Sequence, residues 1–207
     1  MPITHRVVVW DFDGVLNRNV PGGSMSWVPD LQRDMNVDPN AFARDAWSGR
    51  WDLMVTGQED SRQFLLGVLQ NQNAQVDVDV FMRYCFDRDA RPYDEVLALL
   101  GRVNDAGVRS VIATNNDPYR SKYIWETMGM EHRVDRLFAS GHLGVMKPNE
   151  AFYQKVHAEL GGVARGEVFF IDDQRKNVDA AARFGWQAHC FEGDVDGLRQ
   201  ALGLEEV

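Results

Sequence analysis

The chain has 207 residues, of which 44% are hydrophobic and 26% charged, a composition typical of a globular protein. Its 31 acidic residues outnumber 22 basic ones, for a formal net charge of -9, and no basic run occurs, so we expect neither nucleic acid nor an anionic membrane surface as a partner. No apolar stretch is long enough to predict a membrane span or a secretion signal.

Short apolar runs rich in β-branched residues recur along the chain and predict strands that are buried on both faces of a parallel sheet. These runs cover residues 6–10, 108–113, 137–139, 168–171 and 187–191. Helical segments separate them, and two are clearly bounded, one by Pro92 and Gly107 and the other by Pro148 and Gly161. The alternation predicts an α/β fold with a Rossmann-like parallel sheet core.

The long segment between the first two predicted strands has a different character. Apolar residues recur at helical spacing within residues 40–51 and 62–71, and no convincing strand pattern occurs within residues 17–88. The candidate inward-facing side chains are Phe42, Ala46, Trp47, Phe64, Leu65, Val68 and Leu69. We therefore expect residues 17–88 to form a helical cap inserted into a catalytic core made of residues 1–16 and 89–207.

Polar side chains follow three of the predicted strands, at the edge where open parallel sheets bind their ligands. They are Asp11 and Asp13 after the first strand, Thr114, Asn115 and Asn116 after the second, and Asp172 and Asp173 at the end of the fourth. Lys147 lies in a polar loop before a predicted helix. We expect these groups to meet at one rim of the sheet.

The carboxylates at this rim predict a metal site. Asp11 and Asp13 are two apart on an extended segment, and two close carboxylates do not both ionise readily without a cation. Asp172 and Asp173 bring the number of carboxyl groups to four, with no soft ligand, which favours Mg²⁺ over zinc or copper. Each feature alone is more often a turn, a helix cap or a surface lysine, so the interpretation depends on their joint position.

Four motifs then resemble those of a known family. In chain order they are VVVWDFDGVL, VIATNND, VMKPNEAFY and VFFIDDQRKNVDAA. They are similar to the ordered motifs of the haloacid dehalogenase-like (HAD) hydrolases, over the whole chain, and the helical insert resembles that family's type 1 cap. TNN and FIDDxxxN are most similar to small sugar-phosphate phosphatases and to the phosphatase domain of soluble epoxide hydrolase. The resemblance implies a magnesium-dependent phosphomonoesterase that hydrolyses a small phosphorylated metabolite, such as a sugar phosphate.

The resemblance also implies catalytic roles. Asp11 would be the nucleophile that forms an aspartyl phosphate, and Asp13 would be the general acid and then the general base. Thr114 would donate a hydrogen bond to the phosphoryl group, and Lys147 would neutralise its charge and keep Asp11 ionised. In dehalogenases of the family the second aspartate is replaced, so Asp13 favours phosphate esters as substrates.

A second set of roles concerns the metal. The resemblance makes Asp173 a direct Mg²⁺ ligand together with Asp11 and the backbone carbonyl of Asp13, with Asp172 nearby or acting through water. The family often has an acid four residues after the direct ligand, where this chain has Asn177. An amide there can still anchor a metal-bound water.

Substrate recognition is predicted less sharply. We expect Asn115 and Asn116 to contact phosphate or the first hydroxyls of the substrate, with a capping or turn role as an equal alternative. Arg50, beside a predicted helix break, is our candidate for a second anionic group on the substrate, with a solvated surface arginine as the alternative. Trp27, Trp47 and Trp51 lie in or beside the predicted cap, where a packed stripe is a more frequent role than a sugar-binding platform.

Two alternative functions stay open at this point. A phosphomutase of the same fold would use the same residues while excluding water. A non-enzymatic interaction protein is a third hypothesis, but such a protein has no need of the complete set Asp11, Asp13, Thr114, Lys147 and Asp173. Cys85 and Cys190 form no CxxC pattern, which favours a reducing, cytoplasmic location. The expected partner is a small-molecule phosphate ester, and the sequence carries no signal of oligomeric state.

Overall fold

The computed structural model describes residues 5–19, 28–46 and 49–205. It contains a parallel sheet of five strands in the order β3-β2-β1-β4-β5. The strands are β1 (Val7–Trp10), β2 (Arg109–Thr114), β3 (Leu137–Ala139), β4 (Val168–Asp172) and β5 (Gln187–Cys190). The predicted α/β fold and all five predicted strand positions are thus confirmed.

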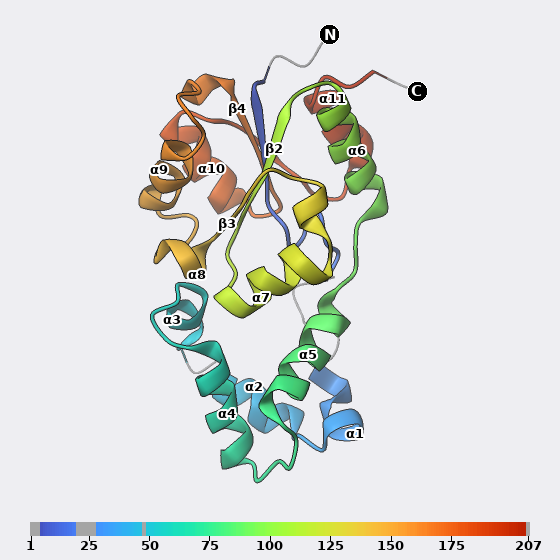
Figure 1. Ribbon diagram of the computed structural model, residues 1–207, viewed down its shortest axis with the longest axis vertical. Coiled ribbons are helices and arrows are strands. Elements are labelled where there is room, and N and C mark those ends of the chain that lie inside the picture. Colours follow the sequence, from blue (N-terminus) through green and yellow to red (C-terminus); the bar gives the residue numbers. More distant parts are fainter. Residues whose placement is uncertain (1–4, 20–27, 47–48, 206–207) are drawn as a thin grey trace.

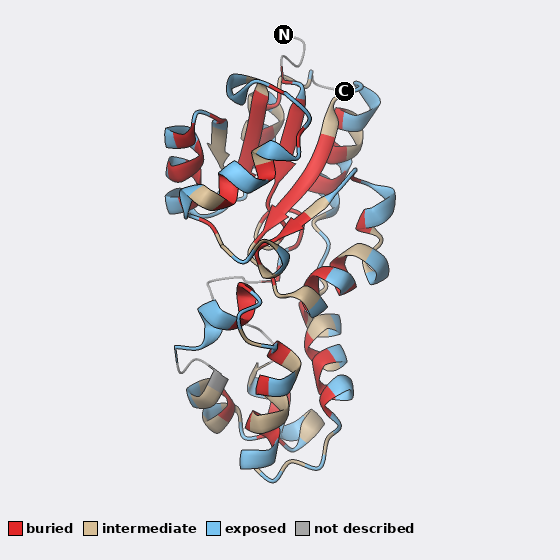
Figure 2. Ribbon diagram, turned by 60° about the vertical axis from the view of Figure 1, so that its left-hand side comes forward, coloured by how far each residue is buried: buried red, intermediate tan, exposed pale blue. Residues whose placement is uncertain are grey.

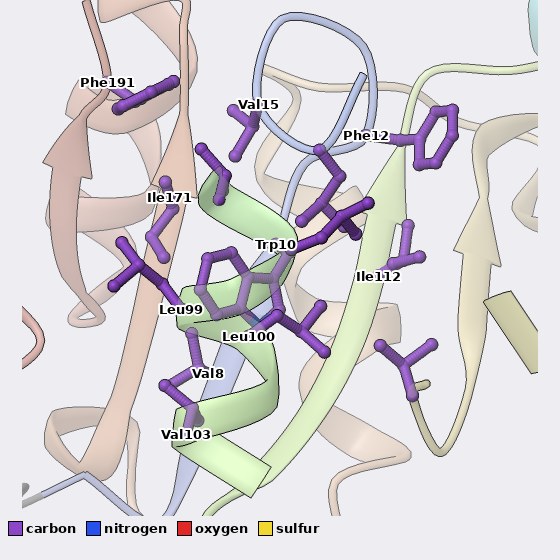
Figure 3. Packing of buried hydrophobic residues seen from close by; sticks show 14 of the residues in the cluster. Val8, Trp10, Phe12, Val15, Leu99, Leu100, Val103, Ile112, Ile171 and Phe191 are labelled. Atoms are coloured by element: carbon purple, nitrogen blue, oxygen red, sulfur yellow. The ribbon is translucent and has the colours of Figure 1, made fainter. Parts of the chain in front are cut away.

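Helices cover both faces of the sheet (Figure 1). On one face, α6 (Asp94–Asp105) and α11 (Val195–Ala201) pack against a cluster centred on Trp10, which is fully buried among residues that include Leu100 and Ile112 (Figure 3). On the other face lie α9 (Glu150–Ala158) and α10 (Arg175–Phe184), with Tyr153 and Phe170 in the second cluster. Burial of this apolar surface on both sides stabilises the layered core.

Shorter helices connect the strands at the edge of the core. They are α7 (Pro118–Lys122), which continues into the π-helix η3 (Tyr123–Thr127), the 3₁₀-helices η4 (Met130–His132) and η5 (Arg165–Glu167), and α8 (Ser140–Leu143). Asp117 caps α7, since its side chain accepts hydrogen bonds from the backbone N–H groups of Tyr119 and Arg120. Among the described helices none is long and apolar enough to cross a bilayer.

The segment between β1 and α6 is helical and has a hydrophobic cluster of its own (Figures 1 and 2). Its elements are η2 (Val28–Asp30), α1 (Leu31–Met35), α2 (Pro39–Ala46), α3 (Trp51–Val55), α4 (Ser61–Asn71) and α5 (Val78–Asp89). Four of the predicted inward-facing residues are buried, namely Phe42, Phe64, Val68 and Leu69, and Leu65 packs against them in part. Trp47 and the side chain of Ala46 lie outside the described residues.

The helical segment meets the core at the carboxyl ends of the strands. The Ser61 hydroxyl donates a hydrogen bond to Asp117 Oδ1 at 2.9 Å, and the Tyr119 hydroxyl donates to Asp60 Oδ2 at 2.8 Å. The Ser140 hydroxyl donates to the backbone carbonyl of Val55. These contacts place the helices beyond the rim where the sequence predicts the site.

Candidate active site

The sheet order brings the predicted strand ends together. β1 lies between β2 and β4, and Trp10 is paired with Ile112 on one side and Ile171 on the other. Asp11 follows Trp10 directly, and Asp172 follows Ile171, so both carboxylates reach the same edge. From β1 the chain first adds β2 and β3 on one side and then adds β4 and β5 on the other side. The strand order therefore reverses between β1 and β4, which is where open α/β sheets bind ligands.

Lys147 joins two of these carboxylates through one buried ammonium group. Its Nζ lies 2.8 Å from Asp11 Oδ1 and 2.6 Å from Asp172 Oδ2, and its side chain is 1% exposed. Burial alone would lower the pKa of Lys147, but the charges and hydrogen bonds of Asp11 and Asp172 raise it, so the ammonium stays charged. Lys147 therefore supplies a fixed positive charge beside Asp11.

Asp172 is held in place by donors on both oxygens. Its Oδ1 accepts from the backbone N–H of Gln174 at 2.8 Å, and the Asn177 amide donates to Oδ1 at 3.0 Å and to Oδ2 at 3.1 Å. Asn177 is itself buried, and the Tyr153 hydroxyl donates to its backbone carbonyl at 2.9 Å. Asn177 therefore orients Asp172. The position of Asn177 in the sequence motif did not suggest this role.

Three carboxylates form a cluster of oxygen donors, the kind of ligand that a hard cation prefers. Ligand atoms of Asp11, Asp172 and Asp173 all lie within 4.8 Å of one another. Burial, followed by the charge of Asp172, raises the pKa of Asp173 to about 6, and burial also raises the pKa of Asp11 although Lys147 opposes it. A divalent cation would stabilise the ionised forms of these oxygen donors, so the residues fit Mg²⁺.

Asp13 lies on the same loop and is held by two amides. Its Oδ1 accepts from Asn17 Nδ2 at 3.0 Å and its Oδ2 from Asn116 Nδ2 at 2.9 Å. The Asn116 amide also donates to Thr114 Oγ1 at 2.8 Å, which links the ends of β1 and β2. The side chain of Asp13 remains 25% exposed, so it is accessible to a ligand while its orientation is restrained.

Asn17 was missed by the sequence interpretation, although it is fully buried beside Asp13. The same Nδ2 group that contacts Asp13 donates to the backbone carbonyl of Asp89 at 2.9 Å, and Oδ1 accepts from the backbone N–H of Arg91 at 2.7 Å. Through these hydrogen bonds Asn17 connects the loop after β1 with residues 89–91, where the chain returns from the helical segment to the core.

Asn115 supports the loop that carries Lys147. Its Nδ2 donates to the backbone carbonyl of Lys147 at 3.0 Å, and its Oδ1 accepts from the backbone N–H of the same residue at 2.9 Å. These two hydrogen bonds give Asn115 a structural role in the loop, which is the alternative to a contact with the substrate. A contact between Asn115 and a substrate stays a prediction.

The structure places the candidate cap residues as follows. Arg50 forms an ion pair with Glu59, its side chain is 53% exposed, and its guanidinium carbon lies 5.0 Å from the centre of the Phe64 ring. Trp51 is 41% exposed. Trp27 and Trp47 lie outside the described residues.

Comparisons with known proteins identify the family of the chain. A model of the haloacid dehalogenase-like hydrolase family matches residues 5–185. The GMP/IMP nucleotidase YrfG of Escherichia coli is 27% identical over 172 residues, which are 83% of this chain, and the chain spans about two thirds of that protein, 66% of its length.

Solved structures show the same fold. A HAD family enzyme of Bacteroides thetaiotaomicron, in complex with magnesium and inorganic phosphate, matches with a TM-score of 0.72 and 17% identity, over 90% of this chain and 93% of the other. The L-2-haloacid dehalogenase of Xanthobacter autotrophicus matches with a TM-score of 0.64 and 19% identity, over 96% of this chain and 83% of the other. The family match, together with the carboxylates and lysine assembled at the strand ends, shows that the chain belongs to the haloacid dehalogenase-like hydrolases.

Proposed function

We propose that the protein is a magnesium-dependent phosphomonoesterase that hydrolyses a small phosphorylated metabolite through an aspartyl-phosphate intermediate. The observation that supports this most strongly is the Lys147 ammonium between Asp11 and Asp172, with Asp173 in the same carboxylate cluster. Phosphoryl transfer needs a nucleophile next to fixed positive charge, because negative charge spreads over the phosphoryl oxygens in the transition state.

In the first step Asp11 attacks phosphorus. A bond forms between a carboxylate oxygen of Asp11 and phosphorus, and the bond from phosphorus to the leaving-group oxygen breaks. Lys147 and the Thr114 hydroxyl offset the charge of the phosphoryl oxygens. Magnesium, held by Asp11, Asp173 and the backbone carbonyl of Asp13, would supply further positive charge at these oxygens when bound.

Asp13 moves the protons in both steps. It donates a proton to the leaving alkoxide in the first step, and in the second it removes a proton from the water that attacks the aspartyl phosphate and releases Asp11. The amides of Asn17 and Asn116 support this role, since they restrain the carboxyl group while leaving it accessible.

The substrate would be selected by the helical segment. We assign residues 17–88 to a cap, because their helices lie beyond the strand ends and contact the loops there. Residues 1–16 and 89–207 form the catalytic core in this proposal. Sugar phosphates and purine nucleoside monophosphates are the first substrate classes to examine, the latter because a relative is named as a GMP/IMP nucleotidase.

A phosphate-release screen tests this function. Sugar phosphates, purine nucleoside monophosphates and 4-nitrophenyl phosphate are incubated with the protein in Mg²⁺, in excess chelator, and in chelator followed by Zn²⁺ or Mg²⁺. We expect release that chelation abolishes, that Mg²⁺ restores and that Zn²⁺ restores poorly. Full turnover in excess chelator would contradict the role of the metal. The variant Asp11→Asn should be inactive, and its normal turnover would contradict the nucleophile.

A further inference from the structure

A buried arginine stands beside Asp13 and has no role in the steps above. Arg120 lies in α7, and its side chain is 5% exposed. Its Nη1 donates to the backbone carbonyl of Phe86, in α5 of the helical segment, at 3.1 Å. A charged side chain is costly to bury unless its charge and its donors are compensated, so the surroundings of Arg120 indicate what it interacts with.

Aromatic rings hold the guanidinium at the junction of the two parts of the molecule. Its central carbon lies 5.4 Å from the ring centre of Phe86 and 5.3 Å from that of Tyr123. Both distances are within the range of cation–π attraction. The two rings and the Phe86 carbonyl therefore restrain the guanidinium in one orientation.

The other terminal nitrogen of Arg120 approaches Asp13. Nη2 lies 3.9 Å from Asp13 Oδ1, too far for a hydrogen bond but within the distance of an ion pair between the buried guanidinium and the partly exposed carboxylate. Within the described part of the chain, Nη2 is buried and has no hydrogen-bond partner. Its donor capacity thus remains available to Asp13.

We propose that Arg120 is a positioning residue that orients Asp13 for proton transfer to the leaving group. Its charge attracts Oδ1 of Asp13, the oxygen to which Asn17 also donates, and its Nη1 is hydrogen-bonded to the carbonyl of Phe86 in α5. The inference rests on the proposed function, because it takes Asp13 as the general acid. The position of α5 then influences how well Asp13 is aligned.

Leaving-group dependence distinguishes positioning from a general structural role. Phenyl phosphate needs a proton donor for its basic leaving group, whereas 2,4-dinitrophenyl phosphate does not. Arg120→Met retains length and apolar packing but removes the charge, and we expect it to lower kcat on phenyl phosphate by about tenfold with little change on the dinitrophenyl ester. Arg120→Lys should recover part of the loss because it restores a positive charge.

Arg83→Met is the matched control. Arg83 also lies over the Tyr123 ring, at 5.2 Å, but from the exposed surface, where it pairs with Asp87. This variant should behave like the wild type on both esters. Equal losses of Arg120→Met on both esters, or no loss on phenyl phosphate, would overturn the positioning role.

A second measurement separates this inference from the proposed function. If the wild type hydrolyses neither ester, the proposed function fails, and crystal structures of the wild type and Arg120→Met then decide on Arg120 alone. We expect the Asp13 carboxyl group to turn away from its wild-type position in the folded variant. An unchanged Asp13 would overturn the inference.

Discussion

Gly14 and Asp173 approach each other so closely that no side chain fits between them. A Cβ atom on Gly14 would lie 2.5 Å from Asp173 Cγ, and Gly14 has a φ of +85°, which side-chain-bearing residues rarely adopt. The loop after β1 is therefore packed directly against the candidate metal ligand at the end of β4.

Gly14→Ala should consequently impair both folding stability and metal binding. We expect a loss of about 1 to 2 kcal/mol in the free energy of unfolding from backbone strain, and weaker Mg²⁺ binding because Asp173 must move. Gly107→Ala is the control, since Gly107 has a φ of +76° but a Cβ atom added there would have nothing within 4 Å. Urea denaturation and Mg²⁺ titration should show that the control loses stability alone. Unimpaired Mg²⁺ binding by Gly14→Ala would contradict the close packing.

Lys147→Met should destabilise the protein strongly. The change leaves Asp11 and Asp172 buried without their shared cation, and removal of one partner from a buried ion pair costs about 3 to 5 kcal/mol. The control Lys122→Met removes a lysine that is 70% exposed and 3.9 Å from Glu126, for which we expect less than about 1 kcal/mol. Urea denaturation at neutral pH measures both.

The same experiment at lower pH tests the cause. Burial raises the pKa of Asp11, and protonation removes the charge that Lys147→Met leaves without its cation, so the difference between variant and wild type should shrink as the pH falls. A pH-independent difference would point to lost packing instead of lost charge.

Magnesium affinity should fall as the pH is lowered through the pKa of Asp173. That pKa is raised to about 6, so the carboxyl is mostly ionised at pH 7 and mostly protonated at pH 5, where a proton must leave before the metal binds. We expect calorimetric titration with Mg²⁺ to give weaker binding at pH 5 than at pH 7. The folding stability of the metal-free protein should depend on pH in the opposite direction. Because the pKa of Asp173 is higher in the folded state, its protonation stabilises that state as the pH falls from about 6 toward the unfolded pKa near 4. Equal affinities at the two pH values would argue against Asp173 as a ligand.

Arg50→Ala tests the predicted role of Arg50 in substrate binding. The ion pair with Glu59 is largely exposed on the arginine side, so we expect the unfolding free energy to change by less than about 1 kcal/mol. If Arg50 leaves Glu59 to bind a second anionic group, KM should rise for a doubly anionic substrate and stay unchanged for 4-nitrophenyl phosphate. Unchanged KM values for both would assign Arg50 to the surface pair alone.

The sheet and the rim of the site were predictable from local sequence because each strand is a short apolar run and its polar successor marks the strand end. The meeting of Asp11 and Asp172 at one edge of the sheet was therefore predictable, and the polar loop before α9 suggested that Lys147 joins them there. Asn17 and Arg120 were not predictable, because their contacts join distant segments: Asn17 reaches Asp89, 72 residues away, and Arg120 reaches Phe86, 34 residues away.

The helix break predicted beside Arg50 agrees with the start of α3 at Trp51. Gly49, in the sequence SGRW, has a φ of +84°, a conformation that residues with side chains rarely adopt. The glycine was therefore a usable local signal, although the apolar spacing continues through residues 40–51.

The central claim is that Asp11 carries the phosphoryl group during turnover. We would treat Asp13→Asn with 2,4-dinitrophenyl phosphate and Mg²⁺, quench in acid, and measure the masses of the intact protein and of its peptides. The leaving group needs no acid, whereas hydrolysis of the intermediate needs Asp13 as base, so we predict that one phosphoryl group accumulates on the peptide containing Asp11. The double variant with Asp11→Asn should gain none. A phosphoryl group in the double variant, or none in Asp13→Asn while dinitrophenol is released, would contradict the account.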